Sequence, residues 1–315
     1  MDVVASLNDT AIPVVLQPTV QAFVKLLEKS RAEIEGITRK TFRYGEAERH
    51  NLDIYYPPPE ALSGGPVPVL FFAYGGGFST GTRRFEPPAD LGYCNVGAFF
   101  AKRGILTVIP DYRLVPDVQF PAPAEDIRDA IAWFLSNTSP VAAPAPSPLS
   151  SSLENPEIFV MGHSAGAHLI TSLFLLPSVL PLSSPIRAAT RGLIPQGGAF
   201  KFDPSKPLLP PGTLEQLYGS EEKALELMPL ALVTKADEEL VKSLPDVFVL
   251  VSELDPESIK DSCDKFVKAL EGRVGKSVKY GVMKGHNHIS PHWALLSGEG
   301  EEWGVQVADW IKSKA

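Results

Sequence analysis

Apolar residues occur along much of this chain in short continuous runs, with few polar positions between them. A continuous apolar run of strand length is typical of a strand that is buried on both faces of a sheet. Such runs predict buried strands over residues 69–73, 105–110, 158–161, 191–196, 247–251 and 277–282. Two shorter β-type runs, 41–44 and 52–56, are separated by a polar segment and predict a hairpin at a sheet edge.

Helical spacing of apolar residues occurs between and around these runs. It predicts helices over 18–35 and 122–135, and the chain has further helical segments over 258–270 and 303–311. Strands that alternate with helices are typical of an α/β fold, because a helix covers each crossover between parallel strands. We therefore expect a doubly wound, mostly parallel sheet.

The remaining stretches are expected to be connections or covering elements. Residues 57–68 are rich in Pro and Gly and predict a loop, and residues 137–156, dominated by Ser, Pro and Ala, predict a mobile surface connection without a packed core. Residues 200–242 contain Pro-rich loop and a helical piece around 214–232, which we interpret as a small helical cap. We expect one domain over 1–315, with cap elements from 1–40 and 200–242.

Composition and charge narrow the class of protein. Hydrophobic residues make up 44% of the 315-residue chain, which supports one large core, and the net charge of −8 comes without a Lys/Arg cluster. Nucleic acid and anionic membranes are therefore not expected as partners. The two cysteines, Cys94 and Cys263, lie far apart without metal-ligand spacing, and the first residues lack a basic leader region. We expect a cytoplasmic protein.

The segment Gly162-His163-Ser164-Ala165-Gly166 directly follows a predicted buried strand and precedes a helix-forming stretch. A nucleophilic serine must stand on a tight strand-to-helix turn, which requires small residues two positions before and after it. The backbone N–H of Ala165 would then lie at a helix start, where it can bind an oxyanion. The alternative is an ordinary Gly-Ser turn.

Three consecutive glycines follow another predicted core strand, in Tyr74-Gly75-Gly76-Gly77-Phe78. Three glycines forgo side-chain packing and cost backbone entropy, so they indicate a close approach of backbone N–H groups to a ligand. The alternative is a flexible hairpin turn. The position after a core strand favours the second half of an oxyanion hole.

These motifs resemble those of the α/β-hydrolase superfamily, in particular the hormone-sensitive-lipase-like esterase group, over roughly residues 52–315. Residues 74–78 resemble the family's H-G-G-G-[FW] motif, and residues 111–134 resemble its Y-R-L-x-P…F-P-x-x-x-x-D segment. Residues 52–57 and the sequence G-H-S-A-G-A-H-L are similar to the kynurenine formamidase and feruloyl/acetyl esterase branch. Tyr74 replaces the family's leading His, which is expected to alter the support of the loop more than its chemistry.

The resemblance implies an α/β-hydrolase fold and a triad in the chain order Ser, acid, His. It implies Ser164 as nucleophile, Asp255 as the acid, and backbone N–H groups of Gly75, Gly76 and Ala165 as the oxyanion hole. Asp255 also has an alternative role as a helix N-cap before Pro256, and Glu253 is the reserve acid.

Two histidines compete for the role of base, His286 and His288. Asn287-His288-Ile289 resembles the D-H-F segment of the formamidase branch, which favours His288, whereas His286 lies at the end of the last predicted strand. In an extended backbone the two side chains face the same side, so spacing alone does not separate them. His163 and His168 are expected to have packing or hydrogen-bonding roles, and no motif supports His50 or His292.

The function predicted is hydrolysis of small, short-acyl carboxylic esters through an acyl-enzyme, without metal or organic cofactor. The first alternative is an arylformamidase acting on N-formylkynurenine, since the same triad can cleave either bond. The second is a catalytically inactive hydrolase-fold receptor for a small molecule. Phe78, Phe85, Phe200 and Trp293 lie near predicted site loops and are candidate pocket residues. Relatives in the family are often dimers, which makes a homodimer a further expectation.

Overall fold

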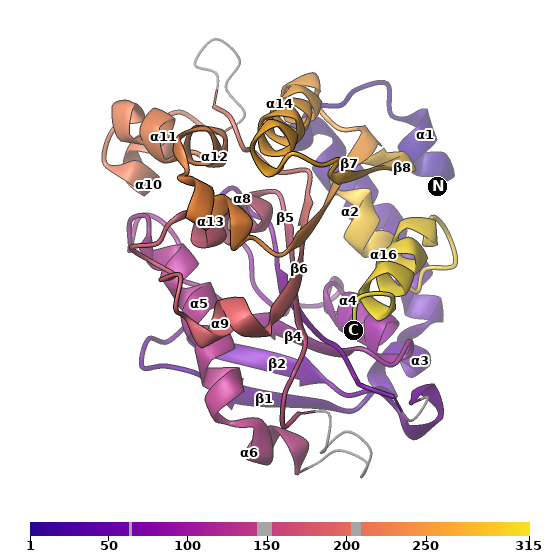
Figure 1. Cartoon of the computed structure of the whole chain (residues 1–315). Helices are drawn as coiled ribbons and strands as arrows, with labels where there is room; N and C mark the ends of the chain where they lie inside the picture. The colour runs from indigo at the N-terminus through magenta and orange to yellow at the C-terminus, as the bar shows by residue number, and fades with distance from the viewer. Residues whose placement is uncertain (63–64, 144–152, 203–208) are drawn as a thin grey trace.

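An eight-stranded sheet runs through the molecule in the order β1-β2-β4-β3-β5-β6-β7-β8 (Figure 1). The computed structural model describes residues 1–62, 65–143, 153–202 and 209–315. The strands are β1 (Arg39–Arg43), β2 (Asn51–Tyr55), β3 (Val69–Ala73), β4 (Leu106–Pro110), β5 (Ile158–His163), β6 (Thr190–Gln196), β7 (Asp246–Leu254) and β8 (Lys279–Asn287). β2 pairs antiparallel with β1 and β4, and the other pairs are parallel. The expected mostly parallel sheet and the edge hairpin are confirmed.

Helices cover both faces of the sheet (Figure 1). They are α1 (Asp2–Ser6), α2 (Ile12–Lys29), α3 (Arg31–Glu35), α4 (Cys94–Ala101), α5 (Ala122–Ser136), α6 (Thr138–Ala142), α8 (Ala165–Leu175), α9 (Pro185–Ala189), α10 (Thr213–Tyr218), α11 (Glu221–Leu227), α12 (Pro229–Lys235), α13 (Glu238–Lys242), α14 (Glu257–Val274), α15 (Ser290–Ala294) and α16 (Glu302–Lys312), with a 3-10 turn at Pro59–Ala61. None of these helices is long and apolar enough to cross a membrane.

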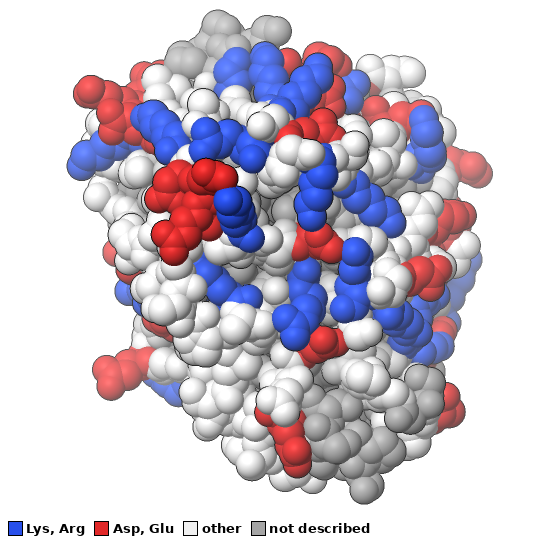
Figure 2. All heavy atoms as spheres, in the orientation of Figure 1, with Lys and Arg blue, Asp and Glu red and all other residues white. Residues whose placement is uncertain are grey.

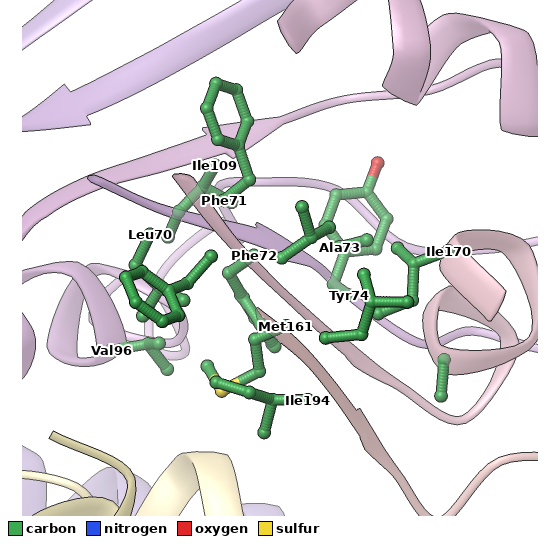
Figure 3. Close-up of a cluster of buried hydrophobic side chains, with 14 of the residues drawn as sticks. Leu70, Phe71, Phe72, Ala73, Tyr74, Val96, Ile109, Met161, Ile170 and Ile194 are labelled. Atoms are coloured by element: carbon green, nitrogen blue, oxygen red, sulfur yellow. The ribbon is translucent and has the colours of Figure 1, made fainter. Parts of the chain in front are cut away.

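The core is centred on β3, whose side chains are all buried. Figure 3 shows Leu70 to Ala73 of this strand in one cluster with Met161 of β5 and Ile194 of β6. Phe71 packs edge-on against Phe134 of α5, with ring centroids 5.5 Å apart, and Phe72 packs at 5.5 Å against Tyr93, which precedes α4. Neighbouring residues of the strand thus contact helices on opposite faces of the sheet. Burial on both faces explains why this strand reads as a continuous apolar run.

Parallel pairing of β5, β7 and β8 places the ends of these strands at one edge of the sheet. Ser164 follows β5, Asp255 follows β7 and His288 follows β8. In open α/β sheets the carboxyl ends of the strands are where ligands bind. The fold therefore brings together three side chains that are far apart in the sequence.

The structure differs from the expected connections in two places. Residues 138–142 form helix α6, in which Val141 is fully buried and its carbonyl accepts a hydrogen bond from the Tyr56 hydroxyl at 2.9 Å. The prediction of a connection without a packed core is therefore wrong for this part, while residues 144–152 lie outside the described residues. Between 209 and 242 the single expected helical piece is instead α10 to α13, and residues 203–208 are likewise outside the described residues.

Two predicted elements have different bounds. The N-terminal helical segment begins at Ile12 rather than near residue 18 and is interrupted at Ser30, between α2 and α3. The last strand continues to Asn287, so His286 belongs to the sheet.

On the face in view, Lys and Arg side chains are interspersed with Asp and Glu (Figure 2).

Candidate active site

Ser164 stands on a tight turn between β5 and α8. Its backbone has φ 52° and ψ −114°, a conformation that residues other than glycine rarely adopt. A Cβ atom added to Gly166 would lie 2.1 Å from the Ala73 carbonyl oxygen, and one added to Gly162 would lie 2.6 Å from the backbone of Gly166. The two glycines are therefore required by the close approach of backbone to backbone. The turn has the tight geometry that the spacing of the two glycines predicts.

A chain of hydrogen bonds joins Ser164, His288 and Asp255. The Ser164 hydroxyl lies 2.9 Å from Nε2 of His288, and Nδ1 of His288 lies 2.6 Å from Oδ1 of Asp255. Asp255 is 1% exposed and His288 is 2% exposed. The second carboxylate oxygen of Asp255 accepts the N–H of Ser252 at 2.6 Å, which fixes the orientation of the carboxylate. This arrangement can remove a proton from the serine hydroxyl.

Glu253 and His286, the alternative candidates for the acid and the base, have other hydrogen-bond partners. Both ring nitrogens of His286 are within 2.8 Å of other groups, the Ser290 hydroxyl and the Gly300 carbonyl. Glu253 is exposed and pairs with Lys284 at 2.8 Å. Asp255 does not cap α14, because its carboxylate is turned toward His288 and the N-cap residue is Pro256.

The glycine-rich loop packs directly on the serine turn. A Cβ atom on Gly75 would lie 3.1 Å from Cβ of Ser164, so the loop backbone approaches this serine closely. Tyr93 lies near the backbone of Gly75, and burial raises the pKa of its hydroxyl. Among the described residues, the N–H groups of Gly76, Gly77 and Ala165 form no hydrogen bond. These groups are free to bind an oxyanion.

Tyr74, which replaces the leading His of the family motif, supports the loop from beneath. It is fully buried, and its hydroxyl lies 2.8 Å from a carboxylate oxygen of Asp111 and 2.8 Å from Nη2 of Arg49. The same Arg49 nitrogen donates to the carbonyl of Gly81, at the far end of the loop, at 2.8 Å. Arg49 also donates from Nε to the Tyr112 carbonyl at 2.7 Å, within the motif of residues 111–134, but Arg49 itself lies outside any motif. No local pattern links Arg49 to a loop so far along the chain.

His163 and His168 are held neutral by burial and have structural hydrogen bonds near the site. His163, next to Ser164, donates from Nε2 to the backbone carbonyl of His288 at 2.9 Å, and burial lowers its pKa well below the usual value. His168 donates from Nδ1 to the Ala199 carbonyl at 2.7 Å and accepts the Tyr218 hydroxyl at 2.5 Å, and burial lowers its pKa to about 4. His168 thus connects α8 to α10.

His292 and His50 have structural partners as well. Burial lowers the pKa of His292 to about 3, and its Nε2 donates to the side-chain oxygen of Gln196 at 2.7 Å. His50 contacts the Asp126 carboxylate at 3.1 Å. Among residues 1–62, 65–143, 153–202 and 209–315, no group of three or more His, Cys, Asp or Glu side chains could hold a metal ion.

The structure does not support the aromatic residues that were expected to line the pocket. Phe78 is 1% exposed and packs on His168, and Phe200 is 0% exposed and stacks on Phe266 of α14 at 4.4 Å. Trp293 packs on Phe85 at 5.6 Å and is 7% exposed. Three of the four candidates therefore fill the protein interior and present almost no surface to a substrate. Proximity to the site loops in the sequence does not distinguish a side chain that packs in the protein interior from one that lines a substrate pocket.

Comparison with known proteins shows which family the chain belongs to. A family model described as an alpha/beta hydrolase fold matches residues 70–291. The chain belongs to this family, a class of hydrolases, which confirms the class of enzyme that the motifs predicted.

The relatives include proteins of the branch that the sequence resembles. A kynurenine formamidase of Salmo salar is 22% identical over 89% of this chain and 85% of its own length. An esterase of Pyrobaculum calidifontis superposes with a TM-score of 0.66 at 20% identity, covering 99% of this chain and 95% of its own. An esterase of the bacterial hormone-sensitive lipase family superposes with a TM-score of 0.65 at 16% identity, covering 95% and 98%. The resemblance to this esterase group is confirmed.

Proposed function

We propose that this protein is a serine hydrolase that cleaves small carboxylic esters through an acyl-enzyme. The observation that carries the proposal is the continuous hydrogen-bonded chain from the Ser164 hydroxyl through His288 to Asp255. A serine hydroxyl is a weak nucleophile at its ordinary pKa, and a histidine in this position removes its proton as the serine attacks.

In the first half of the reaction Ser164 attacks the ester carbonyl carbon, and the hydroxyl proton passes to Nε2 of His288. Asp255 keeps Nδ1 protonated and stabilises the imidazolium that forms. The N–H groups of Gly75, Gly76 and Ala165 bind the oxyanion. His288 then returns the proton to the leaving alkoxide, which departs as the alcohol and leaves the acyl group on Ser164.

In the second half a water molecule gives a proton to His288 and attacks the acyl carbon. The Ser164 oxygen leaves as the tetrahedral intermediate collapses, and His288 reprotonates it. The products are a carboxylic acid and the free enzyme. All the groups that this cycle needs are supplied by the chain itself.

The second candidate is cleavage of an N-formyl aryl amide. It is favoured by the kynurenine formamidases among the relatives, which match the chain over 89% and 86% of its length. The proposed triad can attack a formamide carbonyl as well as an ester carbonyl. The two candidates therefore differ in the acyl and leaving-group pockets.

The test is to measure kcat/KM for p-nitrophenyl acetate and for N-formylkynurenine with the parent protein and with Ser164→Ala. We expect ester turnover to exceed formamide turnover, and both to be lost in Ser164→Ala. A higher kcat/KM for N-formylkynurenine would favour the formamidase. Turnover of either substrate that persists in folded Ser164→Ala would overturn the serine mechanism.

Within the ester class we propose a preference for short acyl chains. The expectation is that kcat/KM in a series of p-nitrophenyl esters from acetate to palmitate is highest for the shortest chains. A maximum among the long chains would contradict it. Initial rates below the micelle-forming concentration of each ester provide the comparison.

A further inference from the structure

A pocket that contains none of the triad residues lies between α3, α4 and the edge strands β1 and β2. Its volume is about 580 Å³. Figure 1 shows these helices at one end of β1 and β2. Apolar side chains form part of its wall, namely Ile34, Ile37, Phe85 and Leu91.

The polar end of this pocket is made by Arg39, Tyr55 and Cys94. Arg39 and Tyr55 are directly opposite on β1 and β2, so their side chains share one face of the sheet. The Tyr55 ring is fixed from the other side, because a Cβ atom on Gly97 of α4 would lie 2.3 Å from it. Nη1 of Arg39 lies 3.1 Å from the Cys94 sulfur.

The Tyr55 hydroxyl is buried without a hydrogen-bond partner among the described residues. It lies next to the Cys94 thiol and the Arg39 guanidinium, both of which influence its pKa. Burial raises the pKa of Tyr55 well above its ordinary value, so the hydroxyl remains a donor. A buried hydroxyl without a partner is costly, and a ligand that accepts its hydrogen bond would remove that cost.

Among the described residues around the pocket, the Arg39 guanidinium has no carboxylate partner. The acidic residues at its rim, Glu35 and Asp90, are both paired with Arg31, and Arg84 is paired with Asp53. Within the described part of the chain, Arg39 forms no ion pair with a carboxylate, and its hydrogen bond goes to the Cys94 sulfur. The groups that converge here can all donate, and Arg39 carries a positive charge.

A guanidinium and a hydroxyl that both donate are suited to an oxyanion, and a carboxylate is the oxyanion that Arg recognises in a planar, bidentate manner. The apolar wall beside them is suited to a ligand with an apolar body. We propose that this pocket binds a small carboxylate with an apolar or aromatic body, on Arg39 and Tyr55. The proposal is independent of the esterase activity, because no triad residue takes part.

Titration calorimetry with benzoate, and with benzamide as its uncharged analogue, tests the site. The variants are Arg39→Met and Tyr55→Phe, and Arg43→Met on the same strand is the matched control, since Arg43 bonds only to backbone carbonyls of its own turn. We expect benzoate to bind the parent and the control equally, and each pocket variant about 10-fold or more weakly, as for the loss of one charge-assisted hydrogen bond. Benzamide is expected to bind far more weakly than benzoate.

The melting temperature of Tyr55→Phe gives a second readout. Because the substitution removes a hydroxyl without a partner, the ligand-free variant is expected to melt at or above the temperature of the parent. A clearly lower melting temperature would show that the hydroxyl is already satisfied and would overturn the premise. Absence of saturable benzoate binding, binding that the pocket variants leave unchanged, or equal binding of benzamide would each overturn the proposal.

Discussion

At the scale of single residues, His286 and His288 have different hydrogen-bond partners although only Asn287 lies between them in the sequence. Strand β8 carries His286 into contacts with Ser290 and Gly300, whereas His288 follows the strand and contacts Ser164 and Asp255. Sequence spacing could not make this distinction, because both positions face the same side of an extended chain. The hydrogen-bond partners favour His288 as the proposed base.

We predict that His288→Ala lowers kcat for p-nitrophenyl acetate by on the order of 10⁴-fold, since members of a triad act as a unit. His286→Gln, which keeps an amide donor near the Gly300 carbonyl, is expected to retain kcat within about 10-fold. Circular dichroism of both variants checks the fold. If folded His288→Ala kept near-normal activity while His286→Gln lost it, the assignment would be reversed.

The sequence predicts local geometry best where a chemical requirement fixes neighbouring residues, and it predicts the surroundings of a side chain poorly from its position in the chain alone. Ser164 and its flanking glycines were recognisable because a tight turn requires small residues at fixed offsets. Phe200 and Trp293 were named because they lie near site loops, yet burial by residues distant in sequence determines their role. The support of Tyr74 by Arg49 depends on a contact between segments that no short motif joins.

At the scale of elements, the serine turn depends on the contact between α8 and the end of β3. We predict that Gly166→Ala lowers the free energy of unfolding by about 3 kcal/mol, because the added Cβ would overlap the Ala73 carbonyl and force the backbones apart. Gly272→Ala in α14 is the control, since its Cβ would meet nothing within 4 Å. It is expected to raise stability by about 1 kcal/mol through helix propensity.

Urea unfolding followed by fluorescence measures both variants. Equal stability changes for Gly166→Ala and Gly272→Ala would contradict the close packing of the turn on β3. An activity assay is a useful companion, because a shifted turn moves the Ser164 hydroxyl away from His288 and lowers kcat in addition to stability.

Elements with a regular apolar pattern were predictable, and those without one were not. The buried strands β3, β4 and β5 read directly from continuous apolar runs. Helix α4 was missed because each of its residues is buried, so it has no polar face and no helical period. The end of β8 was missed because Lys284, Gly285 and His286 interrupt the apolar pattern while the sheet pairing continues.

At the scale of the whole molecule, buried neutral histidines make stability depend on pH. Burial lowers the pKa of His168 and of His286 to about 4 and that of His292 to about 3. In the unfolded chain their pKa is about 6.5, so between that value and the folded values the unfolded state binds more protons. Stability is therefore present above pH 6.5 and is lost as the pH falls toward about 4.

We predict that the free energy of unfolding falls between pH 7 and pH 5 by on the order of 2 kcal/mol for each of these histidines. Urea unfolding at the two pH values measures the change, and pH 5 is still above the range in which ordinary carboxylates titrate. His168→Gln is expected to show a smaller change than the parent. A stability that is flat over this range would contradict the neutral, buried state of the histidines.

The central claim is that Ser164 forms a covalent acyl intermediate, and intact-protein mass spectrometry after acid quenching tests it directly. The parent protein, mixed with excess p-nitrophenyl acetate and quenched within milliseconds, is expected to gain the mass of one acetyl group. A peptide digest of the same sample is expected to place this group on the peptide that contains Ser164. Ser164→Ala is expected to gain none. An unmodified parent that also fails to react with a fluorophosphonate would contradict the account and favour a catalytically inactive, ligand-binding member of the family.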